Sequence, residues 1–176
     1  MATRFVAVLV YLVVLLTAVP AFADYGAQSM ALVARALTFA PDYSNTRVRV
    51  ALIIDPNNPT SVEEAREIVS ASRNEAQLSS VHMEMINVPI AEIDGMPDAD
   101  VYWITRGLRP YYKKVAAIAT SRRRLSASSD LDCAAEQLCV LGVQARPSVK
   151  IVLSSAAASR CGISFQPVFR MMVTER

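Results

Sequence analysis

Four polar residues that could bind a small charged molecule follow two apolar runs of the chain. Asp55 and Asn57 come after the run at 48–54, and Thr105 and Arg106 come after the run at 101–104. If both runs are parallel strands, their carboxyl ends share the sheet edge where ligands of such folds bind. An acid, an arginine and hydroxyl groups could hold a small zwitterion there; alternatively, these polar residues simply fill loops. The same edge is expected to carry Asn58, Arg109, Ser126, Ser128 and Ser129.

The three cysteines are the second group of residues that could do chemistry. Cys133 and Cys139 bracket a short loop, and Cys161 follows later. We favour a Cys133–Cys139 disulfide because local loops close most easily; the alternative joins Cys161 to one of the other two. A metal site is disfavoured because the single histidine, His82, is distant in sequence and no CxxC pair exists.

Motifs for catalysis or cofactor binding are missing from the sequence. It contains no GxSxG, HExxH, P-loop or GxGxxG pattern. With one histidine and no paired acid and base, we expect a protein without enzymatic activity and without a cofactor. The basic run at 122–124 could meet an anionic partner, but a solvated helix end explains it better.

The first 23 residues resemble a cleavable export signal. Arg4 precedes an apolar run at 5–19, and Ala21 and Ala23 provide the small residues that signal peptidase requires. The run is shorter than the roughly 20 residues that span a bilayer. We therefore expect cleavage after Ala23 and a periplasmic product with no stable membrane insertion. The alternative is a retained N-terminal anchor.

The charge of the product argues against nucleic-acid binding. The full chain carries a formal charge of +2, and residues 1–23 contain one base and no acid, which leaves about +1. So small a net charge argues against a nucleic-acid binder that is driven by counterion release. Residues 24–176 are the right length for a single domain.

Alternating strand and helix patterns predict how these groups are positioned. The run at 47–54 is apolar on both faces, as in a central parallel strand. Thr60 and Glu63 fit a capping box at the start of the next helix. We expect an α/β domain of three layers, with a mainly parallel, flavodoxin-like or Rossmann-like open sheet and a C-terminal antiparallel hairpin. The expected strands are 47–54, 81–88, 101–104, 124–127, 140–143 and 149–153. The expected helices are 29–40, one from Thr60, 110–120, 155–161, which Gly162 stops, and one from Pro167. The inner face of the helix from Thr60 is expected to carry Val62, Ala65, Ile68 and Val69.

Four large apolar residues near the C-terminus form a candidate interface. Phe165, Phe169, Met171 and Met172 recur close to helical spacing. Flexible methionines are common on surfaces that bind other proteins. The competing interpretation, which we favour, is that these side chains belong to the core.

The order of segments resembles the YfiR-like periplasmic proteins. The resemblance covers about residues 30–173 and rests on the export signal and on short apolar motifs. These motifs are Val48-Arg-Val-Ala-Leu-Ile-Ile54, Asp98-Ala-Asp-Val-Tyr-Trp-Ile104, Ser148-Val-Lys-Ile-Val-Leu153, Gly162-Ile-Ser-Phe165 and Phe169-Arg-Met-Met-Val173.

The resemblance implies regulation rather than catalysis. Repression of an inner-membrane diguanylate cyclase through its periplasmic domain is the best-known activity of this family, and disulfide redox state is thought to influence it. The segment from Cys133 to Cys139 could play that part here, although its cysteine spacing does not clearly reproduce the founding pattern. We therefore expect a regulator that binds a membrane-anchored signalling protein. The alternative is a small-ligand-binding accessory protein of a transporter or sensor, and an enzyme is a weaker third choice.

Overall fold

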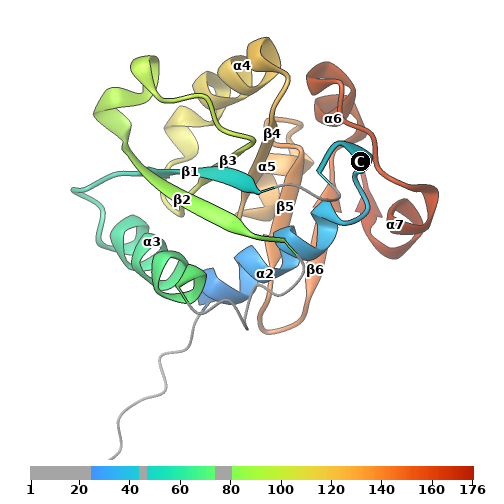
Figure 1. The fold of residues 1–176 in the computed structure, drawn as a ribbon, viewed down its shortest axis with the longest axis horizontal. Coiled ribbons are helices and arrows are strands. Elements are labelled where there is room, and N and C mark those ends of the chain that lie inside the picture. Colours follow the sequence, from blue (N-terminus) through green and yellow to red (C-terminus); the bar gives the residue numbers. More distant parts are fainter. Residues whose placement is uncertain (1–24, 44–46, 74–80) are drawn as a thin grey trace, which may run out of the picture.

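A computed structural model describes residues 25–43, 47–73 and 81–176 of the 176-residue chain (Figure 1). The predicted export signal at 1–23 lies outside the described residues. Within the described ranges, no helix is long and apolar enough to cross a membrane.

One seven-stranded sheet organises the structure. The strands lie in the order β2-β1-β3-β4-β5-β6-β7, and the first five run parallel. β6 is antiparallel to β5, which completes the expected C-terminal hairpin. The fold class predicted from the sequence is therefore confirmed. The strands are β1 (Val48–Ile54), β2 (Met83–Pro89), β3 (Val101–Ile104), β4 (Leu125–Ser128), β5 (Leu141–Gln144), β6 (Lys150–Leu153) and β7 (Thr174–Glu175).

The strand order creates a topological switch point between β1 and β3. The chain moves outward from β1 to β2, then returns to the other side of β1 and continues through β3, β4 and β5. This is the flavodoxin-like order, in which neighbouring loops at the switch point diverge and leave room for ligands beyond the carboxyl ends of the strands. Right-handed crossovers in such sheets place helices on both faces.

Helices cover the two faces of the sheet in pairs. α2 packs against α3, and α4 packs against α6. Figure 1 shows these two pairs on opposite sides of the strands. The helices are α2 (Tyr25–Leu37), α3 (Pro59–Ser72), α4 (Tyr112–Arg122), α5 (Leu131–Ala135), α6 (Ser155–Cys161) and α7 (Pro167–Met172).

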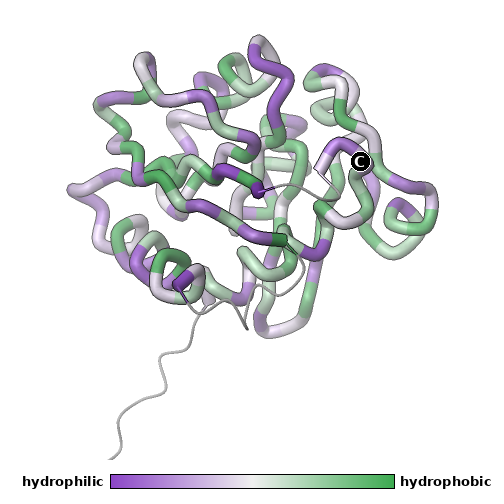
Figure 2. The backbone as a smooth tube through the Cα atoms, in the orientation of Figure 1, coloured by the Kyte–Doolittle hydropathy of each residue, from purple (hydrophilic) through white to green (hydrophobic). Residues whose placement is uncertain are grey.

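The core lies along the central strands. All four residues of β3 are buried, and its Tyr102 and Trp103 are among the largest side chains with no exposed surface. Strands covered on both faces need apolar residues on both sides, which explains the continuous apolar pattern. Figure 2 shows hydrophobic stretches along the strands and hydrophilic stretches in many connecting loops.

The start of α3 differs from the expected capping box. Asn58, not Thr60, is the cap: its side-chain oxygen accepts hydrogen bonds from the backbone of Thr60 and Ser61. The reason is Pro59, which lacks an N–H and suits the first helical position. Thr60 therefore lies inside the helix.

The chain reverses at the ends of α4 and α6 through left-handed residues. Arg123 closes α4 with φ 55°, and Gly162 closes α6 with φ 67°. Glycine adopts this conformation without steric penalty, whereas an arginine does so at some cost. Gly162 was expected as a helix stop, whereas the conformation of Arg123 has no signature in the sequence.

The disulfide joins Cys133 to Cys139, and Cys161 has a free thiol. This is the pairing that the sequence favours. The bridge ties α5 to the loop before β5 and lies fully inside the core. Disulfides of this kind form and persist in oxidising compartments, so the bridge fits an exported protein.

Candidate functional site

The carboxyl edge of the sheet brings the two predicted loop pairs next to each other. Ile53 of β1 lies opposite Ile104 of β3, so the loops that follow start side by side. Thr105 is completely buried, and its hydroxyl donates to the Ile53 carbonyl over 2.7 Å and contacts the Ser61 hydroxyl over 2.6 Å. Thr105 thereby fixes α3 to the sheet rather than facing solvent.

Asp55 and Asn57 are occupied by the turn that they form. An Asp55 carboxylate oxygen accepts from the Asn57 backbone over 2.9 Å, and the Asp55 amide donates to Ser61. Opposite this turn, Gly107 has φ 83°, and a Cβ there would clash with the Asn58 side-chain amide. Only glycine fits this position, so the two loops are held tightly together.

A buried glutamate on α3, which the sequence reasoning missed, organises the polar groups at this edge. The Glu64 side chain has no exposed surface. One oxygen accepts from Trp103 Nε1 over 3.3 Å, and the other accepts from the Arg106 backbone N–H over 2.7 Å and from Arg106 Nε over 3.3 Å. The expected inner stripe of α3 included Val62 and Val69, but the helix is rotated so that Glu64 faces inward.

Two opposing effects act on the pKa of Glu64. Burial raises the pKa of Glu64, while the Ser129 hydroxyl and the Arg106 backbone and guanidinium oppose that rise. Ser129 Oγ is itself buried and makes no hydrogen bond of normal geometry within the described part of the chain. A buried acid with several donors is well suited to hold an arginine in one orientation.

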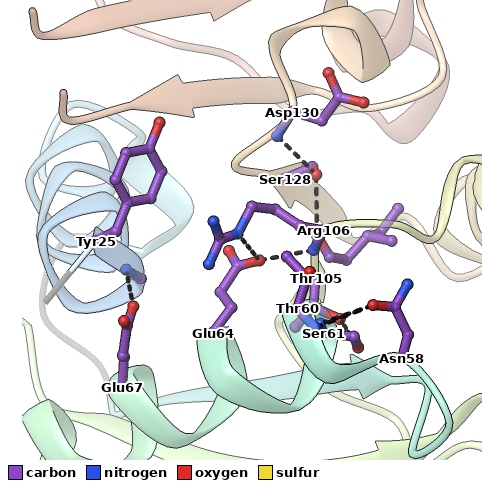
Figure 3. A network of polar contacts seen from close by, with 12 residues as sticks. Tyr25, Asn58, Thr60, Ser61, Glu64, Glu67, Thr105, Arg106, Ser128 and Asp130 are labelled. Atoms are coloured by element: carbon purple, nitrogen blue, oxygen red, sulfur yellow. Dashed lines mark hydrogen bonds and ion pairs between the residues drawn. The ribbon is translucent and has the colours of Figure 1, made fainter. Parts of the chain in front are cut away.

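Arg106 is the group at this edge that can reach a ligand. Its side chain is 32% exposed, its Nε is held by Glu64, and its guanidinium carbon lies 5.2 Å from the Tyr25 ring centroid. Figure 3 shows the side chain extending over Glu64 towards Tyr25 on α2. Among residues 25–43, 47–73 and 81–176, no partner is found for its two terminal nitrogens. These nitrogens present the planar fork that matches a carboxylate or phosphate.

Residues after β4 complete the edge. The Ser128 hydroxyl donates to the Ile104 carbonyl and accepts from the Asp130 backbone. Asp130 also accepts from the Tyr112 hydroxyl over 2.8 Å, and burial together with this acid raises the pKa of Tyr112. Arg109 pairs with two acids of the α5 region, Asp132 and Glu136, and is thus engaged elsewhere.

The candidate interface near the C-terminus divides into a buried half and an exposed half. Phe165 and Phe169 are 9% and 2% exposed and stack on each other, and Phe169 also stacks on Phe39. Met171 and Met172 on α7 are 80% and 61% exposed. The aromatic pair therefore belongs to the core, as we favoured for all four residues, whereas the methionines face solvent.

No residue set suited to a metal ion occurs within the described ranges, where three or more His, Cys, Asp or Glu side chains do not come together. The carboxyl edge instead combines an arginine that is fixed by a buried acid with a second acid, Asp130, while the hydroxyls of Thr105 and Ser128 are buried and bonded within the protein.

Comparisons with known proteins identify the fold but not a family. No family model and no curated protein matches the chain. A conserved domain protein from Vibrio cholerae O1 biovar El Tor superimposes with a TM-score of 0.66 at 9% identity. An ABC domain in complex with L-Trp from Streptococcus pneumoniae gives 0.61 at 13%. A ligand-free, open substrate-binding protein with adhesive properties from Clostridium difficile gives 0.57 at 10%.

The alignments cover 85%, 85% and 82% of this chain but only 59% of each of those chains. The chain thus spans about 59% of the length of the structures that it matches. At such low identity the likeness supports the α/β fold alone, which agrees with the sheet described above.

Proposed function

We propose that this protein binds a small carboxylate-bearing molecule, such as an amino acid, at the carboxyl edge of the sheet and has no catalytic activity. The observation that carries the proposal is the Arg106 guanidinium, which Glu64 fixes and whose terminal nitrogens have no partner among the described residues. An arginine held in this way has little side-chain entropy left to lose when a ligand binds.

The surroundings of Arg106 support the same function. The edge lies at the switch point between β1 and β3, where ligands of flavodoxin-like sheets bind. The Asp130 carboxylate accepts hydrogen bonds from the Tyr112 hydroxyl and the Asp132 backbone, and its negative charge would attract the ammonium group of an amino acid to this edge. Two of the structures with the same fold are described as binding proteins or as a ligand complex, one of them with L-Trp.

Titration of a panel of L-amino acids and simple carboxylates tests this function. The single tryptophan, Trp103, donates to Glu64 and therefore reports on the site through its fluorescence. We expect a saturable change with at least one panel member, accompanied by a rise in unfolding temperature because ligands stabilise the state that they bind. A flat response to the whole panel contradicts the proposal.

Matched variants separate ligand binding from folding. Arg106→Met alone leaves Glu64 as an unpaired buried charge, so the informative variant is Arg106→Met combined with Glu64→Gln. We expect this double variant to fold and to bind the ligand at least tenfold more weakly. Arg109→Met changes the same residue type on the same side of the sheet and should bind normally, because Arg109 is engaged with Asp132 and Glu136.

We also propose that the chain is exported to the periplasm after cleavage following Ala23. The disulfide and the basic, apolar and small-residue pattern of residues 1–23 support this. N-terminal sequencing of protein recovered from the periplasm should begin at Asp24. Recovery of full-length chain starting at Met1 would contradict cleavage.

A second candidate function is regulation of a membrane-anchored signalling protein, such as a diguanylate cyclase with a periplasmic domain. The observation in its favour is the exposed Met171 and Met172 on α7. Met171→Ser with Met172→Ser should abolish co-purification with such a cyclase and raise cellular cyclic di-GMP. Cyclic di-GMP unchanged on deletion of the whole gene contradicts this function.

A further inference from the structure

A cleft lies at the amino edge of the sheet, opposite the edge that carries Arg106. It encloses about 560 Å³, a volume within the range of small-molecule sites. Arg47 precedes β1, Asp100 precedes β3 and Arg124 precedes β4, so three strand starts contribute to its wall. The remaining lining residues are Asp42, Tyr43, Arg123, Cys161, Gly162 and Ile163.

Two arginines of this cleft carry charge that no acid of the described residues neutralises. Arg124 is paired with Asp98 over 2.8 Å and with Asp100 over 3.5 Å. Arg47 and Arg123 are both exposed, and neither forms an ion pair with any described residue. After these pairings, Asp42 is the single remaining acid of the lining, so the cleft has an excess of positive charge.

The backbone presents Arg123 to the cleft at an energetic cost. Its left-handed conformation is unfavourable for a residue with a side chain. The guanidinium nevertheless lies against Gly162, where an added Cβ would come within 2.6 Å of Nη2. Two left-handed residues from α4 and α6 thus meet at one wall of the cleft, and glycine at 162 leaves the space that the guanidinium occupies.

We infer that the amino-edge cleft binds a small anion through Arg47 and Arg123. The fitting class is a compact molecule with two or more negative charges, because two separated guanidinium groups can contact two anionic groups at once. Phosphate and carboxylate groups share this chemistry. The inference does not depend on the function proposed for Arg106, which lies at the other edge of the sheet.

Isothermal titration calorimetry with pyrophosphate, citrate and inorganic phosphate at constant ionic strength tests the inference. We expect saturable one-to-one binding of pyrophosphate or citrate. Binding of pyrophosphate indicates a phosphate ligand, and binding of citrate indicates a carboxylate ligand. Arg123→Gly and Arg47→Gln should each weaken binding about tenfold, the gain of a bidentate charged contact being of that order. Because Arg123→Gly relieves the backbone conformation, we expect this variant to fold as the wild type does.

Two further variants keep the test specific. Asp42→Asn removes the opposing negative charge and should tighten binding two- to threefold, the opposite sign from the arginine variants. Arg66→Gln makes the same charge change on an exposed position of α3 and should leave binding unchanged. The Arg106→Met/Glu64→Gln variant should bind the anion as the wild type does, which keeps this site distinct from the carboxyl edge.

The inference is overturned if none of the three anions binds, or if Arg66→Gln weakens binding as much as Arg123→Gly. The latter result would mean a general electrostatic effect of net charge. In an NMR titration with the anion, chemical-shift changes confined to residues distant from Tyr43 and Gly162 would also overturn the inference.

Discussion

The two edges of the sheet use arginines in opposite ways. At the carboxyl edge, Arg106 is held by the fully buried Glu64. At the amino edge, Arg47 and Arg123 lie around a cleft and have no acidic partner among the described residues. Burial explains the difference, because a buried charge must be paired whereas an exposed charge can remain unpaired in water. The carboxyl edge is therefore rigid and costly to alter, and the amino edge is adaptable.

Replacement of Glu64 gives the largest expected effect and tests the rigidity of the carboxyl edge. Glu64→Ala leaves the Trp103 indole N–H and the Arg106 backbone N–H without acceptors. We expect a loss of about 3 kcal/mol in the free energy of unfolding, as for other buried pairs broken on one side. Urea unfolding followed by circular dichroism measures this. Glu63→Ala, on the exposed side of the same helix, is the control and should change stability by under about 0.5 kcal/mol. Equal losses for the two variants would break the comparison.

Removal of the disulfide between α5 and the loop before β5 is the next largest effect. Cys133→Ser with Cys139→Ser should lower the free energy of unfolding by about 2 kcal/mol, because the bridge closes a short loop in the unfolded chain. Reductant should lower the stability of the wild type to that of the double variant and leave the variant unchanged. Thiol titration confirms that both cysteines are reduced. If the free energy of unfolding of the wild type is then unchanged by reductant, this account is contradicted.

Relief of backbone strain tests the adaptability of the amino edge. Arg123→Gly should raise the free energy of unfolding by about 0.5 kcal/mol, because the relief of the left-handed conformation slightly exceeds the added freedom of the unfolded chain. Arg124→Gly is the matched comparison and should be destabilising, since it removes the ion pairs with Asp98 and Asp100. A large loss for Arg123→Gly would mean that Arg123 is structural rather than available for a ligand.

The smallest effect is a difference in pH dependence between the edges. Burial raises the pKa of Glu64, so the Glu64 carboxylate binds a proton more readily in the folded state than in the unfolded state. The contribution of Glu64 to the free energy of unfolding therefore falls as pH rises from about 4.3 through the folded pKa. The hydrogen bond from Arg124 lowers the pKa of Asp98, so its contribution is present above about pH 3.9 and is lost as pH falls.

Acid titration of two amide variants measures these opposite slopes. As pH falls from 6 to 3, the wild type should gain stability relative to Glu64→Gln and lose stability relative to Asp98→Asn. Urea midpoints at a series of pH values give both curves. If both stability differences change with pH in the same direction, the two acids have similar environments and the two edges do not differ in this respect.

The elements of the fold were largely predictable because their patterns are local. β3 was expected at 101–104 and found there, and α6 was expected at 155–161 with Gly162 as its stop. Both follow from short-range properties, namely a run of buried residues between polar flanks and a glycine at a helix end. The predicted cap of α3 was wrong because Asn58 and Thr60 are both good capping residues and lie two positions apart. Pro59 decides between them, since it suits the first helical position.

The candidate site was predictable in part. Arg106 and Thr105 could be placed at the carboxyl edge, because residues after parallel strands share an edge. Glu64 could not be found, since a glutamate in a helix is ordinarily assigned to its solvated face. The signal that was present is its spacing: Ser61, Glu64, Ala65 and Ile68 are all buried and follow the i, i+3, i+4, i+7 pattern.

The sequence by itself determined the alternation of strands and helices, the local disulfide and the residues that follow each strand, because these depend on neighbours along the chain. Only the tertiary structure decided that β1 and β3 lie side by side, that Glu64 is buried beneath Arg106 and that Arg47 and Arg123 line one cleft. These relations join residues 42 to 76 positions apart, and the strand order that brings them together follows from packing of the whole core rather than from any local pattern.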